Sequence, residues 1–222
     1  MKVSFITPPS LDKFKPAERT AGCTRVVYNM VNIYELTVAA LAEQEGYEVA
    51  YRNFVLEEAS SEQFFSFLEN DDSDVYLLWT VNLSIPTDIQ VERFIHAKRP
   101  ESICIFLGPG ATYFAKSLLG HPASVVVRGE PEDTVRELLR YISEGKDWRT
   151  IVGISFWDEN QVVENAPRPL IKNLDELPFP AIHFVEKFVF SNPKLKVSPY
   201  MAMVTSRNCP FHCIYCVPSS LT

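Results

Sequence analysis

The segment that decides the fold of this chain is Ile103-Cys104-Ile105-Phe106-Leu107, which runs directly into Gly108-Pro109-Gly110. An unbroken apolar run of this length, closed by glycine and proline, is typical of a central strand buried on both faces of a sheet. The run Val75-Tyr76-Leu77-Leu78-Trp79 has the same character. Strands of this kind belong to parallel sheets that are covered by helices on both sides.

Further strands and helices alternate along the chain on either side of these two runs. Apolar segments predict additional strands at 2–6, 47–54 and 124–127. Apolar residues at helical spacing predict helices at about 30–41, 60–68, 85–97, 112–120 and 131–142. Ser84 is the expected cap of the third helix. The last helix has the clearest signals, because Pro131 opens it and Glu132 and Asp133 suit its positive end.

Strands that alternate with helices in this way indicate an α/β domain with a doubly wound parallel sheet. We expect five strands in a flavodoxin-like order, formed by residues 1–145. A domain of this size buries about 70% of the surface of its unfolded chain, which is enough for an autonomous core.

The alternating pattern ends at Gly145. Residues 151–163 are expected to form a β-hairpin, and proline-punctuated connectors follow it. We interpret residues 146–199 as a linker between domains. The apolar run at 200–205 is then a fresh strand that begins a second domain at 200–222.

Composition places the chain among ordinary soluble globular proteins, with 46% hydrophobic and 22% charged residues. The sequence contains no apolar run of the roughly 18 residues that a membrane-spanning helix needs. Its first residues, Met1 to Ile6, suit a strand better than a signal peptide. Three of the five cysteines stand in one group, which indicates a reducing, cytoplasmic location rather than a disulfide framework.

The net charge of −7 argues against nucleic acid as a partner, because phosphate binding requires a basic face. Positive charge gathers only locally, and we interpret that group as a solvated surface; it consists of Lys187, Lys194, Lys196 and Arg207.

The grouped cysteines are Cys209, Cys213 and Cys216, within the stretch Thr205 to Cys216. Short spacings of this kind let several thiolates converge on one iron–sulfur cluster. Because a cubane has four irons, three cysteines would leave one iron without a protein ligand. A small molecule could bind and be reduced at that iron.

Two other interpretations of the cysteine group stay open. Structural zinc sites usually have four ligands, and His212 could reach the metal of its neighbour Cys213 only with strain. The Cys213-x-x-Cys216 pair could be a thioredoxin-like redox motif, which would leave Cys209 unexplained.

The cysteine stretch, with Tyr215 directly before its last cysteine, resembles the cluster loop of the radical S-adenosylmethionine (SAM) enzymes. Three other features extend the resemblance to the radical SAM proteins that carry a cobalamin-binding domain. These features are the turn at 108–112, the turn at 129–130 and the segment Leu174-Asp175-Glu176-Leu177-Pro178-Phe179-Pro180. The resemblance implies a [4Fe–4S] cluster, SAM and cobalamin as cofactors.

The resemblance also implies which residues hold these cofactors. Cys209, Cys213 and Cys216 would be the metal ligands, and no catalytic residue beyond the cluster is expected. The cofactor-binding residues would be Thr80, Asn82, Leu83, Gly108, Gly110, Ala111, Thr112, Gly129, Glu130 and Tyr215. In open α/β sheets such loops lie at the carboxyl ends of the strands, where ligands bind. Glycines there would let the backbone approach a bulky ligand, although each of these turns could equally serve only the fold.

The sequence departs from the pattern of that family at three places. Pro131 stands where a second glycine is common, Asn208 stands where glycine is usual, and only the first strand of the barrel is expected within this chain.

Three functions remain to be distinguished. The leading hypothesis is the front part of a cobalamin-dependent radical SAM enzyme that carries out methyl transfer or cyclisation on an unknown small-molecule substrate. The second is a corrinoid-binding carrier or sensor module with a vestigial cluster segment. The third is a flavodoxin-like interaction domain without a cofactor.

Overall fold

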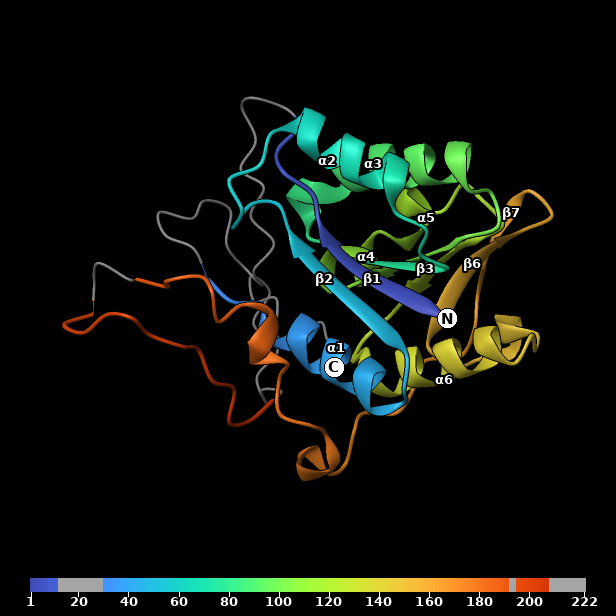
Figure 1. Cartoon of the computed structure of the whole chain (residues 1–222). Helices are drawn as coiled ribbons and strands as arrows, with labels where there is room; N and C mark the ends of the chain where they lie inside the picture. Colours follow the sequence, from blue (N-terminus) through green and yellow to red (C-terminus); the bar gives the residue numbers. More distant parts are fainter. Residues whose placement is uncertain (12–29, 192–194, 208–222) are drawn as a thin grey trace.

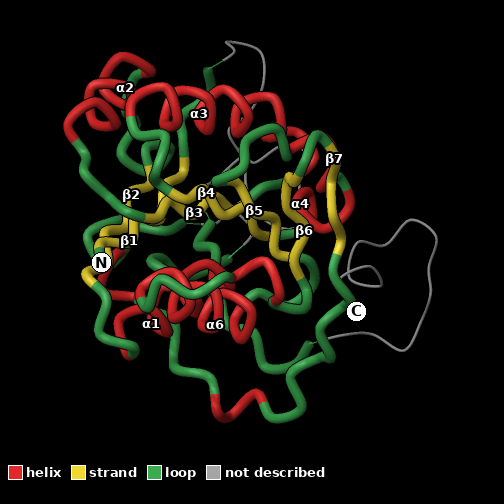
Figure 2. Tube along the Cα trace, turned by 90° about the vertical axis from the view of Figure 1, so that its right-hand side faces the viewer, coloured by secondary structure: helices red, strands yellow, loops and turns green. Residues whose placement is uncertain are grey.

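The computed structural model describes residues 1–11, 30–191 and 195–207, and the predicted cysteine group therefore lies outside the described residues. A sheet runs through the middle of the molecule, with helices on both of its faces (Figure 1). Figure 2 shows α2 and α3 above the sheet and α1 and α6 below it. No helix in the described ranges is long and apolar enough to cross a membrane.

The sheet follows the order β2-β1-β3-β4-β5-β6-β7. The first five strands are mutually parallel, and β6 and β7 are antiparallel to their neighbours. The strands are β1 (Lys2–Thr7), β2 (Glu48–Asn53), β3 (Val75–Trp79), β4 (Ile103–Leu107), β5 (Ser124–Val127), β6 (Ile154–Asp158) and β7 (Gln161–Glu164). The α/β class and the five parallel strands agree with the sequence prediction.

The prediction of a five-stranded sheet was wrong in strand number, because the hairpin that we assigned to the linker continues the sheet. Val127 of β5 pairs with Ile154 of β6. Glu159 and Asn160 at the tip both have positive φ, as a two-residue hairpin turn requires. Ile154 is fully buried in the core, so the hairpin both covers the edge of β5 and adds apolar packing.

The helices are α1 (Ile33–Gln44), α2 (Ser61–Asn70), α3 (Ile85–Lys98), α4 (Pro109–Tyr113), α5 (Ala115–Leu118) and α6 (Glu132–Ser143). The one helix expected at 112–120 is in fact two short ones, and the first begins directly after Gly108. Ser84 does not cap α3. Its hydroxyl instead bonds with Val81 and donates to Asp88 Oδ2, at 2.8 Å.

Two apolar layers cover the sheet, one on each face. Successive residues of a strand point to opposite faces, so Leu77 and Ile105 pack toward α1 and α6, whereas Leu78 and Phe106 pack toward α2 and α3. All four side chains are fully buried. The unbroken apolar runs of β3 and β4 therefore arise because both faces of these strands are covered.

The segment that follows the hairpin has little regular structure. It contains two short 3-10 turns, Leu174–Glu176 and Ile182–Phe184. The strand predicted at 200–205 is not present, and we correct that prediction. Tyr200 donates its backbone N–H to Phe190 O, at 3.0 Å, but no described strand lies beside residues 201–207 to form a ladder with them.

Candidate functional site

The candidate site lies at the carboxyl edge of the sheet, where the loops after β3, β4 and β5 meet. In Figure 1 the arrow of β2 points toward this edge, and the orange-red C-terminal segment lies on the same side. The parallel strands place residues 80–84, 108–112 and 128–131 next to one another there. Ligands of open α/β sheets bind at this edge.

The two glycines after β4 are required by a neighbouring loop. Gly108 has a φ of 90°, and a Cβ added to it would lie 2.8 Å from Trp79 Cε2. A Cβ on Gly110 would lie 2.6 Å from the carbonyl carbon of Val81. Both distances are shorter than real Cβ contacts, so the close approach that these glycines allow is to the loop after β3.

Hydrogen bonds join the three loops into one surface. The Gly110 N–H donates to Thr80 O, at 2.9 Å. Thr112 Oγ1 donates to Gly108 O, at 3.2 Å, and accepts from Gly129 N, at 3.1 Å. Thr112 therefore connects the turn after β4 to the turn after β5.

Burial divides the sequence-predicted cofactor residues into two groups. Thr80, Gly108, Gly110 and Ala111 are buried, so they form the floor of the edge and present almost no side-chain surface. A ligand could reach four of the others, which are exposed or partly buried, namely Asn82, Leu83, Thr112 and Gly129, whereas the Glu130 side chain is only 10% exposed. Tyr215, Cys209, Cys213 and Cys216 lie outside the described residues.

An ion pair that the sequence analysis missed joins this edge to the C-terminal segment. Arg207 Nη2 donates to Glu132 Oε1, at 2.5 Å, and Arg207 Nη1 lies 3.5 Å from Glu130 Oε1. The Arg207 side chain is only 12% exposed and that of Glu132 is fully buried. We expected Arg207 to be part of a solvated surface. It belongs instead to a buried charge cluster.

Two carboxylates share one guanidinium in this cluster. Burial by itself lowers the pKa of Arg207, but the hydrogen bond that it donates to Glu132 and the charges of Glu132 and Glu130 outweigh this effect, so the pKa is raised. Glu130 is also engaged on its other side, because its Oε2 accepts from the Ile171 N–H, at 2.7 Å. Glu130 was predicted to bind a cofactor, and its observed contacts are with Arg207 and Ile171.

Two aromatic rings, Tyr34 and Trp79, connect Arg207 to the buried residues of the carboxyl edge. The guanidinium carbon of Arg207 lies 5.2 Å from the centre of the Tyr34 ring. Tyr34, in the first turn of α1, stacks on Trp79, at 5.9 Å between centroids. Arg207 thus has contacts with α1 on one side and with the loop between β5 and α6 on the other.

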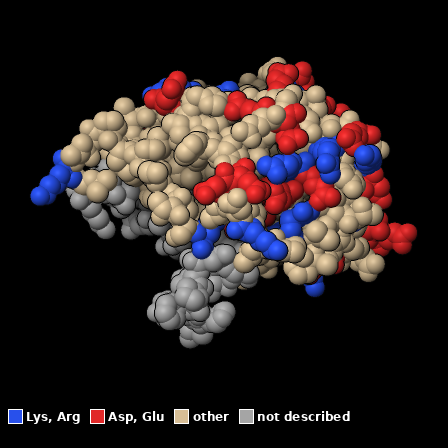
Figure 3. All heavy atoms as spheres, turned by 90° about the horizontal axis from the view of Figure 1, so that it is seen from below, with Lys and Arg blue, Asp and Glu red and all other residues tan. Residues whose placement is uncertain are grey.

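An apolar hollow of about 710 Å³ opens beside Arg207, between α1 and residues 174–182 and 201–205. Phe179 and Met203 at its rim are 92% and 81% exposed. Figure 3 shows the molecule from below. Charged side chains gather on the right-hand half of this view, and the left-hand half, where the C-terminal segment lies, is mostly uncharged.

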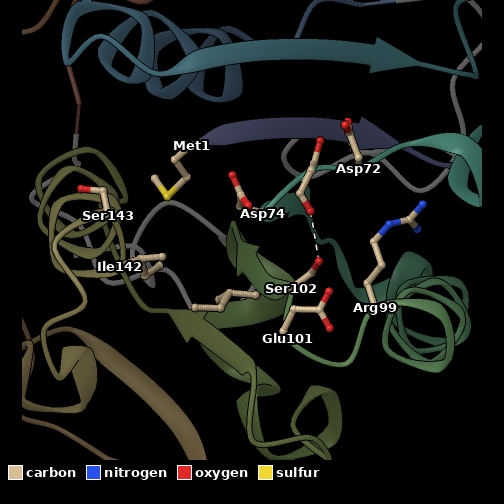
Figure 4. Close-up of a pocket in the computed structure, with 10 residues that line it drawn as sticks. Met1, Asp72, Asp74, Arg99, Glu101, Ser102, Ile142 and Ser143 are labelled. Atoms are coloured by element: carbon tan, nitrogen blue, oxygen red, sulfur yellow. Dashed lines mark hydrogen bonds between the residues drawn. The ribbon is translucent and has the colours of Figure 1, made fainter.

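A second hollow, of about 470 Å³, lies at the opposite edge, near the amino ends of β1, β3 and β4. Figure 4 shows Met1, Asp74, Arg99 and Glu101 around it and the hydrogen bond in which Ser102 Oγ donates to the backbone of Ser73, at 3.0 Å. Because ligands of parallel sheets bind at carboxyl ends, we do not assign this hollow a function.

The fold and this edge define a doubly wound α/β protein with a candidate cofactor site at the carboxyl ends of its strands. Among solved structures the fold is shared with the apo form of the cobalamin-dependent SAM radical enzyme OxsB, at a TM-score of 0.63 and 17% identity over 94% of this chain and 27% of that one. It is also shared with the radical SAM methyltransferase TsrM of Kitasatospora setae, solved with cobalamin and a [4Fe–4S] cluster, at a TM-score of 0.57 and 15% identity over 80% of this chain and 31% of that one.

Curated proteins with similar sequences include methyltransferases, although no family model matches the chain. An uncharacterized methyltransferase of Pyrococcus horikoshii is 25% identical over 99% of this chain and 46% of its own length. The cytidylyl-2-hydroxyethylphosphonate methyltransferase of Streptomyces wedmorensis is 25% identical over 81% of this chain and 42% of its own. The anaerobic magnesium-protoporphyrin IX monomethyl ester cyclase of Synechocystis is 27% identical over 59% and 26%.

The structural neighbours are thus a radical SAM methyltransferase and a cobalamin-dependent SAM radical enzyme, and the curated relatives are methyltransferases and a cyclase, which agrees with the resemblance seen in the sequence. TsrM and OxsB bind cobalamin, and the TsrM structure also holds the [4Fe–4S] cluster. The chain spans less than half the length of these curated relatives.

Proposed function

We propose that this chain supplies the cobalamin-binding and cluster-binding part of a cobalamin-dependent radical SAM enzyme that transfers a methyl group. One observation carries the proposal. Glu130 and Glu132 hold Arg207 at the carboxyl edge, and Cys209 follows Arg207 by two residues. The described chain therefore reaches the edge where the loops after β3, β4 and β5 meet at Arg207, two residues before the first cysteine of the group.

The residues at this edge fit a large, flat ligand. Thr80, Gly108, Gly110 and Ala111 are buried and send no long side chain over the edge, so a broad ring system there would lie against the more exposed residues of these loops. Asn82 and Thr112 offer polar groups at its border. Cobalamin bound there would supply a cobalt centre that carries a methyl group. This chain would bind and orient it, mainly through shape and backbone groups.

Cys209, Cys213 and Cys216 are the proposed ligands of a [4Fe–4S] cluster, on the basis of their spacing. Such a cluster would supply the electron that reduces SAM. Cys104 is not a candidate ligand, because it is fully buried in β4 and burial raises the pKa of its thiol. Cys104 therefore offers a matched control for the other three.

The experiment is anaerobic reconstitution of the chain with iron, sulfide and hydroxocobalamin. We expect about four irons per chain, as a cubane contains, together with bound cobalamin. The Cys209→Ser variant should lose most of the iron and keep the cobalamin, and Cys104→Ser should keep both. Tightly bound zinc in place of iron would refute the cluster. Cobalamin without iron would favour the carrier module, and binding of neither would leave an interaction domain.

A further inference from the structure

Arg207 is a buried residue at the end of an exposed segment. Residues 203–206 are exposed, whereas the Arg207 side chain is only 12% exposed and lies between two carboxylates. A buried charge is costly unless it is paired and hydrogen-bonded, so this placement needs Glu130 and Glu132. The contact is therefore specific to these side chains and is not a general feature of the segment.

Glu132 is fixed by the fold. It stands in the first turn of α6, directly after Pro131, and its side chain is fully buried. The positive end of the helix favours a negatively charged side chain at this position, and Arg207 supplies the counter-charge. Its Oε2 has no hydrogen-bond partner among the described residues. One acceptor thus remains beside Arg207.

The other side of the guanidinium is equally constrained. Tyr34 lies under it, and Trp79 lies under Tyr34. Trp79 in turn is the residue against which Gly108 packs. Arg207 is thereby connected to the loops after β3 and β4 as well as to the loop after β5.

We propose that Arg207 is a positioning residue, which fixes the start of the cysteine group relative to the carboxyl edge and so sets the separation between the cluster and the cobalamin. This inference rests on the proposed function. Two residues of extended chain span at most about 7 Å, so a fixed Arg207 limits where the first thiolate can lie. Lysine at 207 would keep the charge but lose the planar fork that contacts Glu130 and Glu132 together.

The first test measures the separation of the two metal centres. In the reconstituted chain, cob(II)alamin should speed the electron spin relaxation of the reduced cluster. Arg207→Met should keep the iron and the cobalamin but lose most of this enhancement, and Arg207→Lys should lose part of it. The matched control is Arg168→Met, which breaks the half-buried pair with Glu137 away from this site and should change nothing. Wild-type relaxation in Arg207→Met would overturn the proposal.

The second test needs no cofactor, so it separates failure of this inference from failure of the proposed function. A double-mutant cycle of Arg207→Met and Glu132→Gln in urea should give a coupling of about tenfold or more in the unfolding equilibrium, as a buried charge-assisted bond does. The double variant removes the fully buried charge of Glu132 together with its partner, and Glu130 keeps the hydrogen bond from the Ile171 N–H, so the cycle stays measurable. A coupling near zero would mean that the Arg207–Glu132 ion pair does not form, and this result is independent of cofactor binding.

Discussion

The imidazole rings of His96 and His121 lie face to face, with centroids 3.7 Å apart and planes 15° from parallel. His96 Nε2 also lies 3.1 Å from Ser124 Oγ, which in turn donates to Glu92 Oε1, at 2.6 Å. Burial, and to a lesser degree the neighbouring His121, lower the pKa of His96 to about 4. The protein therefore holds His96 neutral at pH values where an exposed histidine is charged.

We predict that the protein loses stability between pH 6.5 and about pH 4 because of His96. In this range the unfolded state binds a proton that the folded state does not, so the stability contributed by neutral His96 is complete above pH 6.5 and falls with pH. The full effect is roughly 3 kcal/mol, at 1.36 kcal/mol per unit. Burial raises the pKa of Glu92, so its earlier protonation in the folded state offsets part of the loss at the acidic end.

The measurement is urea unfolding of the wild type and His96→Gln at pH 7, 6 and 5. The variant should be less stable at pH 7 and should lose less stability on going to pH 5. The control is His183→Gln, since His183 is 55% exposed and bonds only to the surface residue Glu43 among the described groups. An equal pH slope in wild type and His96→Gln would refute the prediction.

A second prediction concerns the glycines of the carboxyl edge. Gly110→Ala should destabilise the protein by about 1–3 kcal/mol, because its new Cβ would overlap the backbone of Val81. The new Cβ in Gly129→Ala has no atom within 4 Å, so only the positive φ of 78° should lower the stability, by about 1–2 kcal/mol. Gly120→Ala, with neither overlap nor positive φ, is the matched control and should be close to neutral. Thermal unfolding of the three variants decides the order.

A third prediction is that a fragment of residues 1–145 does not fold as a stable unit, whereas a fragment of residues 1–173 does. The shorter fragment lacks β6, whose Ile154 and Phe156 cover β5, and it leaves the backbone groups of β5 unpaired on the side away from β4. We expect the shorter fragment to aggregate or to melt without cooperativity. Amide chemical-shift dispersion in both fragments is the measurement. Equal dispersion would place the domain boundary at 145, as first expected from the sequence.

The sequence predicts the parallel strands well and their continuation poorly, for a physical reason. The runs at 75–79 and 103–107 are apolar at every position because both faces are buried, which is a local signal. Whether the hairpin at 154–164 joins a sheet depends instead on which edge is free in three dimensions. No local pattern records that, so we placed it in a linker.

The same difference between local signals and long-range contacts applies to the candidate site. The turns after β4 and β5 were predicted because glycine marks them locally. The Arg207–Glu132 pair joins residues 75 positions apart, and periodicity carries no information about such a contact. The available signal was chemical: two carboxylates directly after a buried strand, and an arginine directly before a cysteine group. We interpreted that arginine as solvated, because most are.

The last prediction is that cobalamin binds to this chain without a histidine on the cobalt. None of the loops at 80–84, 108–112 and 128–131 contains a histidine, and neither does the segment from Thr7 to Arg25 after β1. His96 and His121 lie near the start of β5, at the opposite edge, and His183 bonds to Glu43. A lower ligand from His96 or His121 would require the fold to open.

Bound cobalamin should therefore show base-off absorbance, and cob(II)alamin should show no nitrogen superhyperfine splitting. The variants His121→Gln and His212→Gln should leave both spectra unchanged. His212 is the sharper control, because it stands within the cysteine group and could approach the cobalt if the two cofactors lie together. Nitrogen splitting that disappears in one of these variants would identify a histidine ligand and contradict the prediction. A cobalt without a protein nitrogen is easier to reduce, which would suit the repeated methyl transfer that we propose.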